Sequence, residues 1–307
     1  MTSESQQPAI VLCPGQGAQA VAMGKAWFDA SDAACRIFEQ ADAQLGTSIS
    51  SACFQGPADK LDRTDVGQLA IFVTSIACAR ALTERDQLGP ITAAAGLSLG
   101  EYTALCLAES ITFSQALHVV EARGRFMQEA AEASDSGMIA IIGADESQAN
   151  ELCDNAREGD VLVPANLNCP GQVVISGSTA ACDRAETVAG EMGLRAARLS
   201  VAGAFHSPFM QPAADRLAVV LDEIDWKPPK FPVGCNVTGA AHENDVTTIK
   251  QHLVNHLTSP VRWEQNVRWL LDHATGQYIE LAPGKVLSGL MRRIDRPTKV
   301  TNFSEPD

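Results

Sequence analysis

A serine placed between two glycines, Ser98 in the stretch GLSLG at 96–100, carries a hydroxyl that could act as a nucleophile. The G-x-S-x-G pattern is typical of a nucleophile elbow, in which a strand turns sharply into a helix and raises the serine above the sheet. At such a helix start, the backbone N–H of the next residue, Leu99, can donate to an oxyanion. The alternative interpretation is a tight turn whose serine caps a helix.

A serine nucleophile needs a base to take its proton, and His206 is the candidate. Ser207 and Pro208 follow it and predict the N-cap and first residue of a helix, so the imidazole would stand at a fixed helix entrance. An ordinary loop histidine is the alternative. Many acids lie between positions 98 and 206, and none is singled out by its spacing, so the sequence does not indicate the third member of a triad.

The third candidate functional residue is an arginine on the apolar face of a predicted helix. The helix predicted over 113–133 carries Arg123 in its apolar stripe, at helical spacing from Ala116, Val119, Val120 and Met127. A buried guanidinium requires an anionic partner. That partner is either an internal carboxylate or the carboxylate of a substrate, held by the two-pronged arginine fork. Arg125, on the other side near Glu121 and Glu129, is predicted to be a solvated ion-pair residue.

Length and charge narrow the classes of function. The 307 residues suffice for one large domain, or for a large domain with a smaller insertion. A formal net charge of -14 disfavours binding to nucleic acid and to anionic membranes. No run of about 18 apolar residues and no secretory signal is present, so we expect a cytoplasmic protein without a membrane partner.

Cysteine and histidine usage argues against metal chemistry. The nine cysteines are scattered without a CxxC pair, and the six histidines show no HExxH spacing. We therefore expect free thiols in a reducing compartment, no metal site and no cofactor.

The predicted elements indicate an α/β fold. Strands are expected at 9–13, 92–95, 233–236 and 278–281, and helices at 30–45, 65–85, 99–107, 113–133 and 208–224. Between about 134 and 200 the pattern changes to strands at 138–142, 161–167, 172–176 and 195–199, with helices at 146–157 and 180–192. That βαββαβ order predicts a small ferredoxin-like subdomain inserted into a mostly parallel α/β core formed by 1–133 and 201–307.

Taken together with further motifs, Ser98, Arg123 and His206 give the chain a specific resemblance. It resembles malonyl-CoA:acyl carrier protein transacylases (ACP S-malonyltransferases), including the free-standing acyltransferases of polyketide assembly lines. The motifs extend over nearly the whole chain: PGQGAQ at 14–19, GLSLGEYTAL at 96–105, EARGRFMQEA at 121–130, NLNCPGQVVISG at 166–177, GAFHSPFM at 203–210, SPVRW at 259–263 and APGKVLSGLMRRI at 282–294. The resemblance implies an α/β-hydrolase-like large subdomain with a ferredoxin-like small one.

The resemblance implies a role for each matching catalytic residue. Ser98 would be the acyl-accepting nucleophile and His206 its base, in a Ser-His dyad without a triad acid. A backbone carbonyl would orient the histidine; here it belongs to His256, where many relatives have glutamine. The N–H groups of Gln16 and Leu99 would form the oxyanion hole.

The resemblance also implies residues that line the substrate pocket. Arg123 would hold the malonyl carboxylate. Gln68 and Asn168 match residues of the pocket and of its small-subdomain wall. Leu97 stands where relatives often have histidine, and Phe205 of GAFH would crowd a 2-methyl branch and so favour malonyl.

The implied reaction is a ping-pong transfer of malonyl from malonyl-CoA to the phosphopantetheine thiol of acyl carrier protein, by a monomer, for fatty acid or polyketide synthesis. One alternative is an editing acyl hydrolase that acts on acyl carrier proteins. Another is a catalytically silent docking protein of a synthase complex.

Carrier proteins are usually acidic, so this acidic chain needs a local basic area to receive one. The densest basic cluster comprises Arg292, Arg293, Arg296 and Lys299. We expect Arg292 and Arg293 to receive the carrier; a solvated helix end is the alternative.

Overall fold

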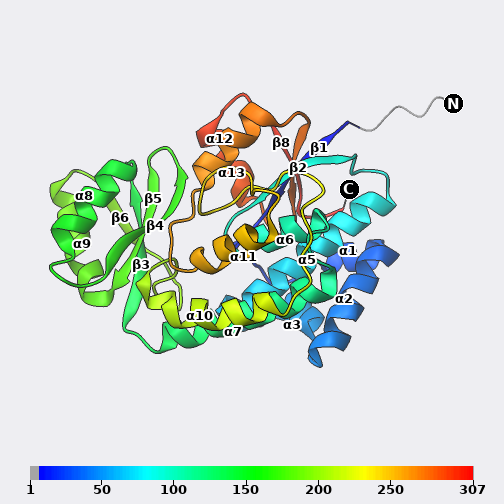
Figure 1. The fold of residues 1–307 in the computed structure, drawn as a ribbon, viewed down its shortest axis with the longest axis horizontal. Coiled ribbons are helices and arrows are strands. Elements are labelled where there is room, and N and C mark those ends of the chain that lie inside the picture. The colour runs from blue at the N-terminus through cyan, green and yellow to red at the C-terminus, as the bar shows by residue number, and fades with distance from the viewer. Residues whose placement is uncertain (1–6, 307) are drawn as a thin grey trace.

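The computed structural model describes residues 7–306, which form two subdomains, each built on its own sheet (Figure 1). The larger sheet is parallel, in the order β2-β1-β7-β8. Its strands are β1 Ala9–Cys13, β2 Ile91–Gly96, β7 Gln277–Leu281 and β8 Val300–Phe303. Every residue of β1 is buried, because helices cover both faces of this sheet.

Alternate residues of β1 face the two helical layers. Val11 belongs to the larger apolar cluster, together with most of the helices, whereas Ile10 and Leu12 pack with the last two helices of the chain. The helices of the large subdomain are α1 Lys25–Ala30, α2 Asp32–Leu45, α3 Ile49–Gln55, α4 Ala58–Asp62, α5 Thr64–Glu84, α6 Gly100–Leu107, α7 Phe113–Glu132, the 3₁₀ turn η1 Pro208–Met210, α10 Gln211–Asp222, α11 Val246–Asn255, α12 Trp263–His273 and α13 Val286–Ile294.

Helix α5 is long and apolar enough to cross a bilayer by length and composition alone. However, 83% of its most apolar window is buried inside the protein. Apolar residues on all sides of this helix therefore reflect its place at the centre of the core.

The smaller sheet lies at the left of Figure 1 and is antiparallel, in the order β4-β5-β3-β6. Its elements are β3 Ser136–Ile142, α8 Glu146–Ala156, β4 Leu162–Cys169, β5 Gln172–Ser178, α9 Thr179–Glu191 and β6 Arg195–Arg198. Ile139 and Ile141 pack with residues of α8 and α9, whereas Met138 joins the core of the large subdomain. This arrangement confirms the predicted α/β class with a ferredoxin-like second unit.

Some predicted elements differ from those observed. The strand expected at 233–236 is reduced to isolated bridges of Val233 and Gly234. The helix expected from 208 begins as the single turn η1, whose N-cap Ser207 accepts a hydrogen bond from the N–H of Phe209. The helix expected over 30–45 is broken at Ser31, whose side chain caps α2.

Candidate active site

Ser98 lies in the sharp turn between β2 and α6, with a backbone φ of 50°, a conformation that non-glycine residues adopt rarely. The glycines around it are required by space. A Cβ on Gly96 would lie 1.8 Å from the carbonyl carbon of Gly100, and one on Gly100 would lie 2.1 Å from the carbonyl oxygen of Cys13. The turn therefore has the geometry of a nucleophile elbow.

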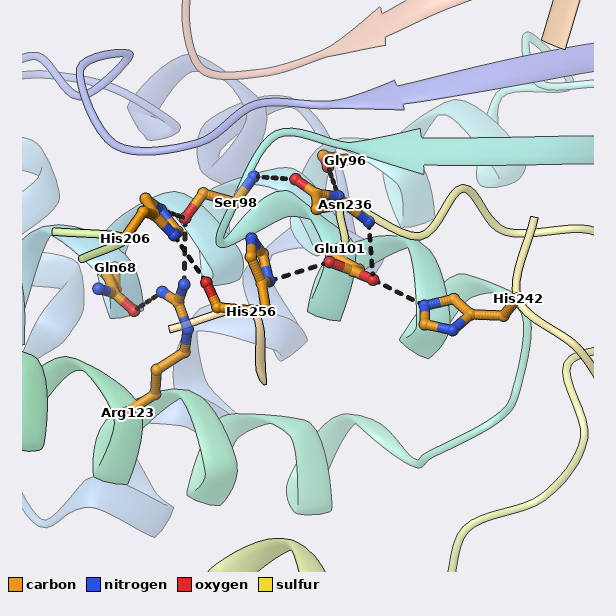
Figure 2. A network of polar contacts seen from close by, with 9 residues as sticks. All are labelled: Gln68, Gly96, Ser98, Glu101, Arg123, His206, Asn236, His242 and His256. Carbon is orange, nitrogen blue, oxygen red and sulfur yellow. Dashed lines mark hydrogen bonds and ion pairs between the residues drawn. The ribbon is translucent and has the colours of Figure 1, made fainter. Parts of the chain in front are cut away.

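His206 reaches Ser98 from the loop before η1. Its Nε2 lies 2.9 Å from the Ser98 Oγ, and its Nδ1 lies 2.8 Å from the backbone carbonyl oxygen of His256 (Figure 2). Because a carbonyl only accepts hydrogen bonds, Nδ1 carries the proton and Nε2 is left to accept one from the serine. The carbonyl oxygen of His256 thus sets both the tautomer and the orientation of the His206 ring.

The surroundings of His206 keep it neutral. Its side chain is buried, and burial together with the neighbouring His256 and Arg123 holds its pKa well below the usual value for histidine. A neutral imidazole at neutral pH is the form that can take a proton.

Arg123 of α7 is fully buried and directed at Ser98. Its Nη2 donates to the Oγ of Ser98 over 3.0 Å, and its Nη1 donates to Oε1 of Gln68 over 2.6 Å. Its Nε has no hydrogen-bond partner, and its guanidinium lies 5.4 Å from the ring centroid of Tyr102. Within residues 7–306 no carboxylate forms an ion pair with Arg123, so the internal carboxylate considered above does not occur, and the positive charge is left for a ligand.

Arg125 is exposed on the opposite side of α7, as predicted, but the expected ion pairs are not formed within the described part of the chain. Glu129 pairs instead with Arg216 of α10. The Arg125 guanidinium lies 5.1 Å from the ring centroid of Phe126. The interpretation failed because helical spacing along α7 did not show that α10 packs beside it.

A cavity of about 270 Å³ opens above the serine, between the two subdomains. It is lined by polar residues near Ser98 and by apolar side chains from both subdomains: Gln16, Gly17, Gln19, Asp62, Gln68, Leu97, Leu99, Arg123, Met127, Met138, Asn166, Leu199, Ser200, Val201, Phe205 and His206. The structure therefore brings the residues expected around the site together, with one exception.

The exception is Asn168, which is not among the residues that line this cavity; Asn166, two positions earlier on β4, is. The pairing of β4 with β5 shifts register between Pro164 and Asn166, and again between Leu167 and Cys169. Such irregularities redirect side chains in a way that simple alternation does not predict. The assignment of Asn168 to the wall of the pocket is therefore corrected to Asn166.

Two backbone donors lie at the serine without acceptors. Within residues 7–306 the N–H groups of Gln16 and Leu99 make no hydrogen bond to protein atoms, although both residues line the cavity. By contrast, the N–H of Ser98 donates to Oδ1 of Asn236. Free N–H groups beside a nucleophile are what an oxyanion hole requires.

The site has a second layer that sequence reasoning missed. Asn236 accepts from the Ser98 N–H over 2.9 Å and donates from Nδ2 to the Gly96 carbonyl over 2.8 Å, so it fixes both ends of the serine turn. The N–H of Asn236 donates to Glu101 over 3.3 Å. A single acid in the otherwise apolar or uncharged stretch GEYTALCL was the available signal for Glu101.

Glu101 is a fully buried carboxylate shared by two histidines (Figure 2). His242 Nε2 lies 2.7 Å from its Oε1, and His256 Nδ1 lies 3.0 Å from its Oε2. Burial alone would raise the pKa of Glu101, but the two histidines outweigh burial and lower it to about 2. A carboxylate charge is therefore held directly behind the residue that orients His206.

The two arginines expected to receive a carrier lie on α13, and both are exposed. Arg293 is already engaged, because its Nη2 donates to the carbonyl oxygens of Pro170 and Gly171 in the β4–β5 turn over 3.0 and 3.2 Å. It fastens α13 to the small subdomain. Arg292 forms no hydrogen bond or ion pair with the rest of residues 7–306, so it is the member of the pair on which docking can be tested.

A serine at a strand-to-helix turn, a neutral histidine at 2.9 Å and a cavity with free N–H groups are the arrangement of enzymes that form acyl-serine esters. The protein thus carries this arrangement on an α/β core with a ferredoxin-like second unit.

Comparisons with known proteins are more specific. The model of the acyl transferase domain family matches residues 10–301. A malonyl CoA-acyl carrier protein transacylase of Bacillus subtilis is 41% identical over 298 residues, covering 96% of this chain and 93% of that protein. This chain belongs to the acyl transferase domain family.

Solved structures agree with this assignment. The malonyl CoA-acyl carrier protein transacylase of Coxiella burnetii superposes with a TM-score of 0.94 at 35% identity, covering 98% of this chain and 95% of that one. A chain from the structure of a type II PKS acyl-carrier protein in complex with its malonyl-transacylase superposes with a TM-score of 0.93 at 36% identity. The match covers 97% of this chain and 96% of that one.

Proposed function

We propose that this chain is an ACP S-malonyltransferase, which moves a malonyl group from malonyl-CoA to the phosphopantetheine thiol of acyl carrier protein. The observation that carries the proposal is the buried guanidinium of Arg123, which has no carboxylate partner in the described chain and contacts the Ser98 Oγ. A dicarboxylate-derived acyl group supplies both the carbonyl for the serine and the anion for the arginine.

In the first half-reaction, the Ser98 Oγ attacks the thioester carbonyl carbon while His206 Nε2 takes the serine proton. The N–H groups of Gln16 and Leu99 would stabilise the developing oxyanion. As the C–S bond breaks, His206 returns the proton to the departing thiol of coenzyme A. The malonyl ester then remains on Ser98, with its carboxylate on Arg123.

In the second half-reaction, the carrier's thiol attacks the ester carbonyl and loses its proton to His206. The C–Oγ bond breaks, and His206 protonates the serine oxygen, which restores the enzyme. A charged clamp that aligns the ester for the thiol favours transfer over hydrolysis. No step requires a metal or a cofactor, and one chain contains every group named, so we propose a monomer.

The carrier is proposed as partner because the relatives are named for it and because one related structure is a complex of a malonyl-transacylase with its acyl-carrier protein. The same relatives leave open whether the product feeds fatty acid or polyketide synthesis. We propose a cytoplasmic enzyme, on the basis of its free cysteines and the burial of α5.

The editing hydrolase is the less favoured candidate, because a neutral acyl chain would leave Arg123 buried and unpaired. A silent docking protein is disfavoured by the contacts among Ser98, His206 and Arg123.

The decisive experiment is intact-protein mass spectrometry after brief mixing with malonyl-CoA, beside acetyl-CoA and methylmalonyl-CoA, on the wild type and Ser98→Ala. We expect a single malonyl adduct on the wild type, absent from Ser98→Ala and discharged by added carrier protein. Release of free coenzyme A without an adduct would indicate hydrolysis. Absence of both adduct and turnover would contradict the transferase.

A further inference from the structure

Three residues with metal-binding side chains, Cys235, His242 and His252, lie together on the side of Glu101 away from the serine (Figure 2 labels His242 there). Their donor atoms all lie within 4.8 Å of one another. None of them takes part in the proposed acyl transfer. The sequence did not indicate the cluster, because its members are spread over 18 positions and match no short metal-binding motif.

The backbone holds two of these residues in a tight hairpin. The N–H of Cys235 donates to the carbonyl of Ala240 over 2.8 Å, and the N–H of His242 donates to the carbonyl of Val233 over 2.8 Å. His252 comes from the last turn of α11, which packs against this hairpin through the cluster. Cys235 and His242 are buried, and the partly exposed His252 forms the side from which solvent reaches the cluster.

The histidine nitrogens of the cluster face the thiol and one another. His242 uses Nε2 for Glu101, which leaves Nδ1, and the polar side chain beside this buried Nδ1 is the thiol of Cys235. The buried Nδ1 of His252 has no hydrogen-bond partner. Buried polar atoms are nearly always paired, so the unpaired Nδ1 of His252, close to the donor atoms of Cys235 and His242, leaves a position at which a shared ligand fits.

We propose that Cys235, His242 and His252 form a binding site for a divalent transition metal of the zinc class. A thiolate with two imidazoles is a donor set for zinc or a similar borderline metal, not for magnesium or calcium, which prefer oxygen ligands. Three protein ligands leave one tetrahedral position for water. Ligand atoms around a tetrahedral zinc are about 3.5 Å apart. Side-chain rotations that move the donor atoms by about an ångström would therefore bring them to this separation.

The surroundings of His242 fit this use. A metal-ligating histidine commonly donates its other ring N–H to a carboxylate, which sets the tautomer. His242 has that arrangement, with Nε2 on Glu101 and Nδ1 facing the cluster. The charges also balance: a divalent ion, the Cys235 thiolate and the Glu101 carboxylate sum to zero, and both the thiol proton and the proton on Nδ1 of His242 are released to solvent on binding.

The proposed ion would brace the active site from behind. It would tie the hairpin to the last turn of α11, directly before His256, whose carbonyl orients His206. The hairpin also carries Asn236, which holds the Ser98 turn. We therefore expect the metal to stabilise the fold rather than to take part in acyl transfer.

The test uses the full-length protein, freed of metal by chelation and titrated with Co²⁺ in the absence of substrate, so that its outcome does not depend on acyl transfer. Thiolate-to-cobalt charge-transfer absorption reports a Cys–Co bond. The variants are Cys235→Ser and His252→Asn; the second alters a partly exposed helix position and serves if the first fails to fold. Cys35→Ser, at the one cysteine that is not buried, is the matched control.

We expect one cobalt per chain, with thiolate absorption that is lost in Cys235→Ser and unchanged in Cys35→Ser. In His252→Asn, the affinity for cobalt should fall at least about tenfold. Zinc at a hundredfold excess over its Kd should displace the cobalt. The Tm of the zinc-bound protein should lie about 4 °C above that of the metal-free protein. Folded wild type without thiolate absorption, absorption that survives Cys235→Ser, or a cobalt affinity that His252→Asn leaves unchanged would overturn the proposal.

Discussion

Arg123 of α7 donates a hydrogen bond to the Oγ of Ser98 over 3.0 Å. The candidate nucleophile is therefore in direct contact with a positive charge. The serine oxygen accepts from this cation while it lies 2.9 Å from the neutral His206. The carboxylate of the proposed malonyl substrate would compete for the same Nη2 group. Substrate binding would therefore exchange the arginine–serine contact for an ion pair and leave the serine hydroxyl to the histidine alone.

The first prediction concerns Arg123→Ala. The ratio of malonyl to acetyl acylation rates should fall about a thousandfold, because two charge-assisted hydrogen bonds at about 2 kcal/mol each are lost for malonyl only. The ratio, measured by quenched-flow labelling of Ser98, cancels any effect of losing the arginine–serine contact.

Arg125→Ala, two residues away on the exposed side of the same helix, is the matched control and should leave the ratio unchanged. A ratio that stays near the wild-type value in Arg123→Ala would mean that the carboxylate is held elsewhere.

The second prediction concerns pH. Burial, His256 and Arg123 lower the pKa of His206, and only its neutral form accepts the serine proton. The acylation rate should therefore stay constant as pH falls through about 6.5, the ordinary histidine value, and decline only at lower pH. Single-turnover acylation with labelled malonyl-CoA measures this profile. A decline centred at or above pH 6.5 would show that the imidazole is charged more readily than its surroundings imply.

The third prediction separates the backbone of His256 from its side chain. His256→Gln keeps the carbonyl that accepts from His206 Nδ1 and supplies an amide that can donate to Glu101, so acylation should stay within about threefold of wild type. His256→Leu removes the polar ring that lies 3.0 Å from Glu101 and should lower the free energy of unfolding by about 1–3 kcal/mol in urea denaturation. A large loss of activity in His256→Gln would assign the imidazole itself a role.

The parts of the site that the sequence predicted are those set by local pattern. Ser98 was marked by its two glycines, Arg123 by helical spacing and His206 by the helix start that follows it. The long helices α5 and α7 were placed to within one residue at each end. Gln16, Gln68 and His256 were reached only through family resemblance, because nothing in their spacing indicates the pocket.

What the sequence missed depends on contacts between distant segments. Asn236 meets Ser98 across 138 positions, and His242 meets Glu101 across 141. Asn166 replaced Asn168 in the cavity because irregular pairing of β4 shifts the side chains. Propensity and periodicity describe one element at a time, so they cannot report which polar side chains two elements bring together.

The fourth prediction tests carrier docking at Arg292. Arg292→Glu should raise the KM for carrier protein about tenfold, a change of about 1.4 kcal/mol in the interaction with an acidic partner, and should leave acylation by malonyl-CoA unchanged. Arg125→Glu on α7, an exposed arginine that forms no ion pair within residues 7–306, is the control for net charge. Arg293 is left intact because it holds the β4–β5 turn. An unchanged KM in Arg292→Glu would remove Arg292 from the docking surface.

The fifth prediction concerns the elbow glycines. Gly100→Ala places a Cβ 2.1 Å from the carbonyl oxygen of Cys13, a main-chain atom that cannot move without shifting β1. We expect it to lower the free energy of unfolding by about 3 kcal/mol, and acylation to fall with it because the Ser98 turn is displaced. Gly190→Ala, at an exposed position of α9 with open space around it, should instead be neutral or stabilise by up to about 1 kcal/mol. Urea denaturation and acylation rates of both variants provide the comparison; a Gly100→Ala protein as stable and active as Gly190→Ala would show that the turn does not need the close approach of its backbone to β1.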